Sequence, residues 1–202
     1  MKGERELCIG LTGRMASGKG EIAEFLKEKG FHYISLSDMV REEVARLRRE
    51  VSRAEMQDIG NSLRKSGGAG VLGRRVRERI VSLDPTRWVI DGIRNPAEVD
   101  ELRRLDSFYL IGIDAGTDII ISRIKSRNRE TDNARDAEIK KRLDREWGIG
   151  EPADGQQVGK CMEMADFFIY NDKSLPELRG EILKILSVIS EQPVSSGKPP
   201  VS

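Results

Sequence analysis

The sequence predicts an α/β protein in which helices cover both faces of a five-stranded parallel sheet. Five short apolar runs alternate with helical patterns along the 202 residues, and parallel strands need helical crossovers between them. A glycine-rich turn joins the first apolar run to the first helical pattern, and polar residues follow the later runs, at the strand ends where ligand sites form. The length suits one domain, which we assign to residues 1–191, followed by a disordered tail at 192–202.

Each expected element rests on its own local pattern. Runs rich in β-branched and aromatic residues predict the strands, and apolar residues that recur every three or four positions predict the helices. The strands expected are Leu7–Leu11, Phe31–Ser35, Trp88–Asp91, Phe108–Asp114 and Phe167–Tyr170. The helices expected begin near residues 19, 37, 53, 71, 96, 117, 134, 156 and 175.

Capping and breaking residues set several of the helix boundaries. Gly30 ends the first helix, and the amphipathic pattern of the second continues to Val51. Ser52 and Asn95 each begin a capping box, and a proline at the first helical position follows the asparagine. Gly67–Gly70 separates the two helices that precede the third strand. Every strand is therefore joined to the next through helix.

The glycine-rich turn after the first strand has the pattern GxxxxGK of a phosphate-binding loop. Small residues let successive backbone N–H groups turn toward phosphate oxygens, and the helix N-terminus and a lysine add positive charge. The residues expected to bind the phosphates of a nucleotide are Gly13, Arg14, Met15, Ala16, Ser17, Gly18, Lys19, Gly20 and Glu21. Gly20 stands where serine or threonine normally gives Mg²⁺ a hydroxyl group, so the metal geometry is expected to depart from the usual one.

Charged residues near the ends of the later strands suit phosphoryl transfer, which needs a positioned donor and acceptor and neutralisation of the phosphoryl charge. Asp91 ends the third strand, where its carboxylate can orient Mg²⁺ directly or through water, with a capping role as the alternative. Arginine binds phosphate through two hydrogen bonds. Arginine clusters are also typical of solvated helix faces, and that interpretation stays open for each cluster.

Two segments after the second and third strands resemble nucleoside monophosphate kinases of the adenylate kinase type. Ser35–Arg41 is similar to the segment in which an Asp-Met-Leu-Arg run places an arginine on the acceptor phosphate, and Asp91–Arg94 resembles the Asp-Gly-Phe-Pro-Arg motif with one residue fewer. The resemblance implies a P-loop NTPase fold with strand order 2-3-1-4-5 and acceptor-binding helices over about 37–84. It assigns the acceptor to Asp38, Arg41 and Arg94, and Mg²⁺, through water, to Asp91.

The same resemblance implies a short helical lid over about 123–142, whose arginines neutralise the transferring phosphate. Arg123 and Arg127 resemble the arginines at the base and tip of the family's lid, and Arg135 lies in the similar stretch beyond it, with Arg129 and Arg142 as alternatives. The catalytic residues that the resemblance implies are Lys19, Arg94, Arg123, Arg127 and Arg135.

Ala165–Asp172 resembles the end of several P-loop kinases, including dephospho-coenzyme A kinase, where an asparagine loop borders the donor adenine. This likeness assigns the adenine to Asn171 and Lys173. An asparagine turn before the last helix is the alternative.

Together, the loop and the resemblance imply an ATP- and Mg²⁺-dependent kinase that phosphorylates the phosphate of a nucleoside or deoxynucleoside monophosphate, or of a similar small acceptor. Dephospho-coenzyme A kinase is one alternative. A kinase-like module that senses nucleotide without catalysis is another, supported by Glu21 and the missing hydroxyl at Gly20. A nucleic-acid binder with basic helices is the third, and its binding would weaken steeply as salt rises.

Composition argues against two classes of partner. The 35 basic and 34 acidic residues nearly cancel, and no apolar run reaches the length of about 18 residues that a membrane span needs. We therefore expect neither a nucleic-acid nor a membrane partner. The two cysteines and the absence of a signal peptide favour a reduced, cytoplasmic protein with Cys8 and Cys161 as small core residues. We expect a monomer or a homodimer.

Overall fold

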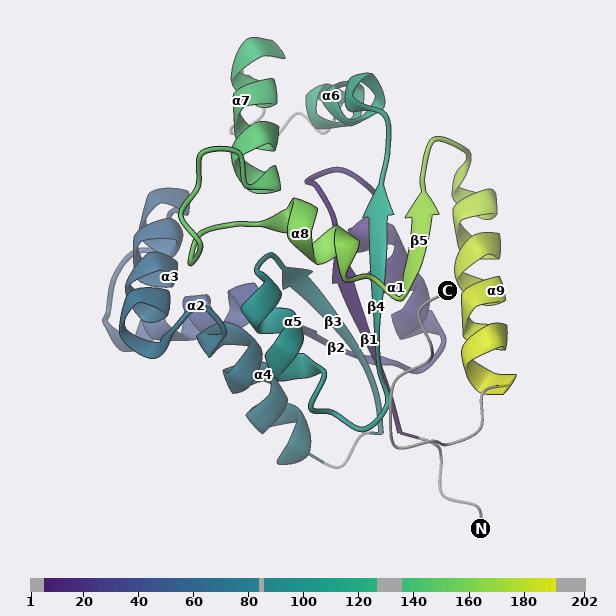
Figure 1. Ribbon diagram of the computed structural model, residues 1–202, viewed down its shortest axis with the longest axis horizontal. Helices are drawn as coiled ribbons and strands as arrows, with labels where there is room; N and C mark the ends of the chain where they lie inside the picture. The colour runs from purple at the N-terminus through teal and green to yellow at the C-terminus, as the bar shows by residue number, and fades with distance from the viewer. Residues whose placement is uncertain (1–5, 84–85, 127–135, 192–202) are drawn as a thin grey trace.

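The computed structural model describes residues 6–83, 86–126 and 136–191. Within these ranges, strands β1 (Leu7–Thr12), β2 (His32–Ser35), β3 (Arg87–Ile93), β4 (Phe108–Asp114) and β5 (Phe167–Tyr170) form one sheet (Figure 1). Every pair of neighbouring strands is parallel, and their order is β2-β3-β1-β4-β5. The predicted fold class and strand order are confirmed.

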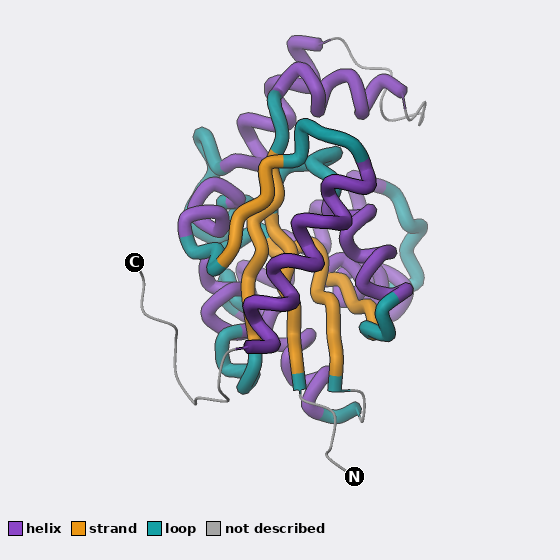
Figure 2. The backbone as a smooth tube through the Cα atoms, turned by 90° about the vertical axis from the view of Figure 1, so that its right-hand side faces the viewer, coloured by secondary structure: helices purple, strands orange, loops and turns teal. Residues whose placement is uncertain are grey.

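Helices connect the strands and lie on both faces of the sheet (Figure 2). Their bounds are α1 Lys19–Glu28, α2 Leu36–Arg46, α3 Arg53–Gly67, α4 Val71–Val81, α5 Pro96–Leu102, α6 Thr117–Ser126, α7 Asp136–Trp147, α8 Val158–Glu163 and α9 Leu175–Glu191. Capping boxes at Ser35 and Asn95 start α2 and α5. These caps satisfy backbone N–H groups that the first turn of a helix leaves without partners.

The two faces of the sheet bury separate apolar clusters. One cluster packs α2, α3, α4, α5 and α8 against one face, and the other packs α1 and α9 against the opposite face. Alternate residues of β1 take part in each, because Cys8 faces the first cluster while Leu7 and Ile9 face the second. Cys8 and Cys161 are both free thiols in the buried interior, as predicted.

A third apolar cluster lies beyond the carboxyl ends of the strands, where α6 and α7 stand at the top of Figure 1. It joins Ile120 and Ile124 of α6 to Ile139 and Leu143 of α7. Ala16, from the turn after β1, is buried in the same cluster. The turn and the two helices above it are therefore packed as one unit.

Two predicted boundaries differ from the structure. The second helix was expected to continue to Val51, but α2 ends at Arg46. Arg48 has a φ of 54°, which is incompatible with a right-handed helix, and Val51 is 60 % exposed rather than on a core face. The third strand continues to Ile93, two residues beyond the expected end. Residues 127–135 of the expected lid and the expected tail at 192–202 lie outside the described residues.

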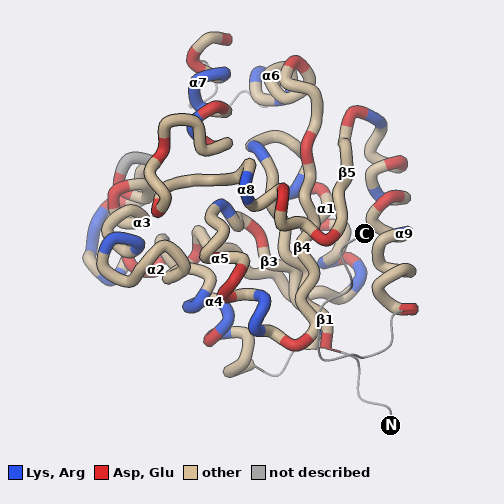
Figure 3. The backbone as a smooth tube through the Cα atoms, in the orientation of Figure 1, with Lys and Arg blue, Asp and Glu red and all other residues tan. Residues whose placement is uncertain are grey.

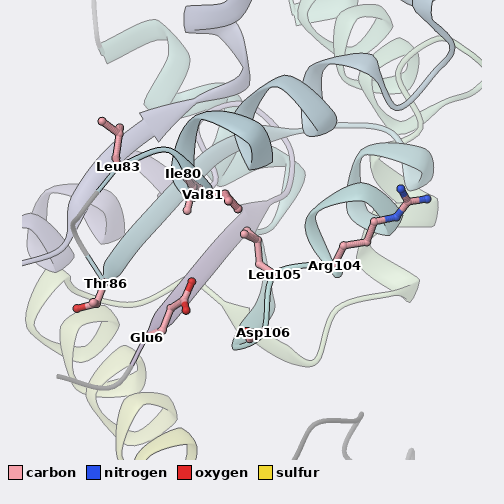
Figure 4. Close-up of a pocket in the computed structure, with 8 residues that line it drawn as sticks. All are labelled: Glu6, Ile80, Val81, Leu83, Thr86, Arg104, Leu105 and Asp106. Carbon is pink, nitrogen blue, oxygen red and sulfur yellow. The ribbon is translucent and has the colours of Figure 1, made fainter. Parts of the chain in front are cut away.

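Some features of the described chain lie away from the predicted site. A pocket of about 310 Å³ between the end of α4 and the loop after α5 lies at the amino ends of the strands (Figure 4). Figure 3 shows Lys and Arg positions interleaved with Asp and Glu positions on α4, α7 and α9. Among the described residues, no helix has both the length and the apolar character required to cross a membrane.

Candidate phosphate-binding site

The turn between β1 and α1 has a backbone that only glycine accommodates at two positions. Gly13 has a φ of 139°, and a Cβ there would lie 1.9 Å from the carbonyl oxygen of Ile113. Gly18 has a φ of 113°, and a Cβ there would lie 2.2 Å from Nδ2 of Asn171. The spacing of these two glycines in the GxxxxGK pattern therefore follows from close contacts of the loop with β4 and with the end of β5.

Lys19 closes the loop from the inside. Its Nζ donates hydrogen bonds to the carbonyl oxygens of Gly13 at 2.7 Å and Arg14 at 2.8 Å. Burial lowers the pKa of Lys19 below its ordinary value of 10.5, while the carboxylates of Glu146, Asp91 and Asp114 act in the opposite direction. The ammonium group is thus held in the loop in a partly buried position, where an anion would interact with it more strongly than in bulk water.

The side chain of Arg14 turns away from the loop interior toward the end of β4. Its guanidinium forms a two-pronged ion pair with the carboxylate of Asp114, at 2.8 and 3.0 Å. It also donates to the carbonyl of Ala115 at 2.8 Å and to the hydroxyl of Thr117 at 3.1 Å. Arg14 was predicted as part of the phosphate-binding loop. In the described structure, its side chain fixes the loop to β4 and α6, and its backbone is the part that remains in the loop.

Asn171, at the end of β5, supports the loop from the other direction. Its buried side-chain amide donates to the carbonyl of Ser17 at 2.8 Å, and its backbone N–H donates to the carbonyl of Asp114 at 2.7 Å. The guanidinium of Arg123 reaches the carbonyl of Asn171 at 3.0 Å and that of Ala16 at 3.4 Å. The Asn171 side chain thus contacts the phosphate loop directly. Neither of its predicted roles, bordering the adenine or forming a simple turn, includes this contact.

A pocket of about 290 Å³ opens beside the loop on this side of the sheet. Its lining includes several residues predicted to bind the donor nucleotide, together with two leucines of α9. They are Ala16, Gly18, Glu21, Arg123, Asn171, Lys173, Leu175 and Leu178. The leucines offer an apolar wall and the other side chains offer polar groups, a combination typical of small-ligand pockets.

The opposite side of the loop holds the residues predicted for the acceptor. Asp38 accepts the backbone N–H of Ser35 at 3.0 Å and a guanidinium N–H of Arg41 at 2.5 Å. The Arg41 side chain is 54 % exposed, so solvent and ligands can reach it. Ser35 pairs in register with Asp91 on β3. The segments that carry Arg41 and Arg94 therefore leave the sheet side by side.

Asp91 is partly exposed at this edge. Its Oδ1 accepts the N–H of Gly92 at 2.7 Å, and its Oδ2 lies 3.4 Å from the hydroxyl of Tyr33. Burial, with Asp91 as the next cause, raises the pKa of Tyr33 to about 12, so the tyrosine stays a neutral donor. Mg²⁺ in nucleotide sites usually keeps several waters and takes one or two carboxylates plus substrate phosphates. The residues present fit that arrangement, with Asp91 as the carboxylate.

The backbone around Arg94 is held by a buried carboxylate. Glu98 is fully buried and accepts the N–H groups of Arg94 at 2.9 Å and Asn95 at 3.1 Å, and a guanidinium N–H of Arg64 at 3.1 Å. Burial raises the pKa of Glu98 above its ordinary value of 4.5, opposed by Arg64 and the backbone donors. The carbonyl of Arg94 in turn accepts the N–H of Gln157 at 2.7 Å. Arg94 is thus fixed at its backbone, and its partly exposed guanidinium donates to the side chain of Gln156 at 3.3 Å.

Two residues at the end of α7 contact the phosphate loop and were not predicted. Glu146 accepts the backbone N–H of Met15 at 2.6 Å, and its other oxygen lies 3.6 Å from the guanidinium of Arg94. The ring of Trp147 lies 5.8 Å from the guanidinium carbon of Arg14. In the sequence, both belong to a charged helix with no motif. The buried position of Glu146 becomes visible only when α7 is placed over the loop.

The remaining predicted residues belong to the expected lid. Arg123 contacts the loop as described above, and Arg142 lies on α7. Arg127, Arg129 and Arg135 lie outside the described residues. The predicted roles of all these arginines stay predictions.

Comparisons with known proteins agree with this architecture. A family model described as an AAA domain matches residues 9–141. A UPF0200 protein of Saccharolobus islandicus is 33% identical over 171 residues, which cover 84% of this chain and 86% of that protein. A UPF0200/UPF0201 protein of Archaeoglobus fulgidus is 33% identical over 184 residues, which cover 88% of this chain but 54% of that longer protein.

Among solved structures, the shikimate kinase of Acinetobacter baumannii in complex with shikimate is similar with a TM-score of 0.57 at 13% sequence identity. The match covers 94% of this chain and 97% of the kinase. At this identity the likeness concerns the fold, which is that of P-loop kinases. The adenylate kinase type within that group remains a resemblance of motifs.

Proposed function

The chain belongs to the family of UPF0200 proteins and to the AAA-domain family, and from this membership and the site we propose that it is an ATP- and Mg²⁺-dependent kinase for nucleoside or deoxynucleoside monophosphates. The observation that carries the proposal is the strand order. β3 and β2 lie on one side of β1, and β4 and β5 lie on the other. The predicted acceptor arginines and the pocket predicted for the donor base are thereby separated by the phosphate loop.

In this proposal the donor phosphates lie on the loop amides and on Lys19, whose ammonium exchanges two carbonyl contacts for phosphate oxygens. The adenine occupies the pocket lined by Arg123 and Asn171. Asp91 would hold Mg²⁺ through water, and the metal would supply positive charge against the donor phosphates. An oxygen of the acceptor phosphate attacks the terminal phosphorus, the bond to the leaving ADP oxygen breaks, and no general base is needed because the attacking oxygen is already anionic.

Arg41 and Arg94 hold the acceptor phosphate in line with the donor. Glu98 fixes the backbone of Arg94, and Asp38 pairs with the guanidinium of Arg41. A guanidinium matches two phosphate oxygens at once and keeps its charge at every physiological pH. The pair would therefore set the position of the acceptor as well as its affinity.

A coupled assay of ADP release tests the proposal with AMP, CMP, UMP, GMP, TMP, their deoxy forms and dephospho-coenzyme A. We expect at least one monophosphate to be phosphorylated. Arg41→Ala and Arg94→Ala should each weaken acceptor binding by about 1.5 to 3 kcal/mol, the range for a charged hydrogen bond, and change ATP binding little. Arg46→Ala is the control, because this arginine of α2 pairs with Glu43 and its side chain is 69 % exposed.

Two outcomes would contradict the proposal. Phosphorylation of dephospho-coenzyme A alone would identify a hydroxyl acceptor instead of a phosphate. ATP binding without phosphorylation of any compound, with both arginine substitutions altering only ATP affinity, would identify a nucleotide sensor.

A further inference from the structure

A buried carboxylate occupies part of the phosphate loop. Glu146 is 3 % exposed, and its Oε2 accepts the backbone N–H of Met15 at 2.6 Å. Backbone N–H groups of such a loop are the groups that bind phosphate oxygens. A side chain of the protein itself thus takes one of the donors on which an anionic ligand would depend.

The surroundings of Glu146 are those of an anion site. Burial lowers the pKa of Lys19, and the carboxylate of Glu146 is the first of the acidic groups that oppose this shift. The Arg94 guanidinium lies 3.6 Å from its Oε1. That oxygen is buried and has no hydrogen-bond partner in the described structure. A buried carboxylate oxygen without a hydrogen bond is costly, so an anion that makes better hydrogen bonds at this place is favoured over the Glu146 carboxylate.

The segment that follows α7 and Glu146 is anchored on the side of the acceptor residues. The backbone N–H of Gln157 donates to Arg94 at 2.7 Å, and the side chain of Asn95 donates to the carbonyls of Ala153 at 2.9 Å and Gly155 at 2.8 Å. These contacts tie the segment after α7 to the turn between β3 and α5. The Glu146 side chain, with its three rotatable bonds, is the part that can leave the loop.

We propose that Glu146 is an internal competitor for the donor phosphates, so that a nucleotide binds only by displacing this carboxylate from the N–H of Met15. The inference rests on the proposed function to the extent that the loop binds phosphate. Glu146 would then determine which anions bind. Anions with one or two charges and few contacts do not displace the carboxylate from the N–H of Met15, whereas a polyphosphate with several contacts does. Displacement of Glu146 also links the occupancy of the loop to the end of α7.

The test measures anion affinity by titration calorimetry, with pyrophosphate and with ATP as probes. Glu146→Gln keeps the shape and can still accept the Met15 N–H, but it removes the charge. We expect both probes to bind about tenfold or more tightly to this variant, the ratio that corresponds to weaker competition by about one charged hydrogen bond. Glu138→Gln is the matched control: it removes the same charge from an exposed position of the same helix.

The outcomes separate this inference from the proposed function. If the wild-type protein binds neither probe, the phosphate-loop assignment itself fails. If the wild type binds both, but Glu146→Gln binds them equally or more weakly, Glu146 supports the loop and does not compete, and the inference is overturned. Equal gains in the two Gln variants would likewise overturn it, since a general charge effect would then explain the result. Glu146→Ala serves as a second variant, with the same expected gain, should the Gln variant fail to fold.

Discussion

The ion pair between Arg14 and Asp114 yields a prediction of stability that the loop motif alone would not suggest. The Arg14 and Asp114 side chains are only 15% and 13% exposed, and four hydrogen bonds leave the guanidinium. Arg14→Ala removes all four and leaves the Asp114 carboxylate mostly buried without its counter-charge. Breaking a fully buried pair costs about 3 to 5 kcal/mol. With the remaining exposure of both side chains, we expect a loss of about 2 to 4 kcal/mol in the free energy of unfolding.

Urea unfolding followed by circular dichroism measures this loss. The double variant Arg14→Ala/Asp114→Ala should lose less stability than the two single variants lose in sum. The reason is that Asp114→Ala removes the buried charge that Arg14→Ala leaves without a partner. Arg46→Ala is the control for losing an arginine, and we expect a change within about 0.5 kcal/mol because its ion pair with Glu43 is at the surface.

Arg14→Ala with wild-type stability and reduced ATP affinity would refute the reasoning. That pattern would mean that the guanidinium is a phosphate ligand, as loop membership alone suggests, and that its contacts with Asp114 contribute little to the fold. A loss of stability without coupling to Asp114 would also refute it, because the cost would then come from some other contact of the arginine.

Two further predictions concern the loop. Burial lowers the pKa of Lys19 below 10.5, and bound phosphate favours the ammonium form, so ATP affinity should fall as pH rises through this lowered pKa. Lys19→Met should bind ATP weakly at every pH. An ATP affinity of the wild type that does not change at alkaline pH would contradict this. Gly18→Ala should lower the free energy of unfolding by about 1 to 3 kcal/mol through backbone strain alone and should displace Asn171. Gly20→Ala, whose added Cβ meets nothing within 4 Å, should change the free energy of unfolding by less than about 1 kcal/mol. Equal effects of the two substitutions on urea unfolding would show that the loop tolerates a side chain at both sites.

The sequence was sufficient for the fold because local signals and global topology agree along the chain. The parallel sheet follows from apolar runs separated by helical patterns, and the capping box at Asn95 is present as predicted. The pattern failed where one residue overrides the periodicity. Leu47 and Val51 continue the apolar spacing of α2, yet the left-handed backbone of Arg48 ends the helix before them. Periodicity alone does not distinguish a helix from the turn that follows it.

The candidate site could be predicted only in part, for a physical reason. The loop and the strand ends carry local signals, since glycine spacing and the position of a carboxylate after a strand are readable in the chain. The partners of those residues are not. Asp114 takes the Arg14 side chain, and Glu146 meets Met15 across 131 positions. The second pair depends on how α7 packs over the loop through the third apolar cluster, and a charged amphipathic helix gives no sign of which carboxylate will be buried.

The contact between Asn171 and Ser17 joins residues 154 positions apart, and this has a consequence for the order in which the protein becomes functional. Synthesis proceeds at about 5 to 20 residues per second, so the loop leaves the ribosome well before Asn171, which follows β5. The region matched by the AAA-domain family, residues 9–141, stops before that support. A nascent or shortened chain ending there would contain every residue of the loop motif while the Ser17 carbonyl still lacked its partner. We therefore expect the loop to gain this support, and with it full affinity for nucleotide, only after β5 has been synthesised and has entered the sheet.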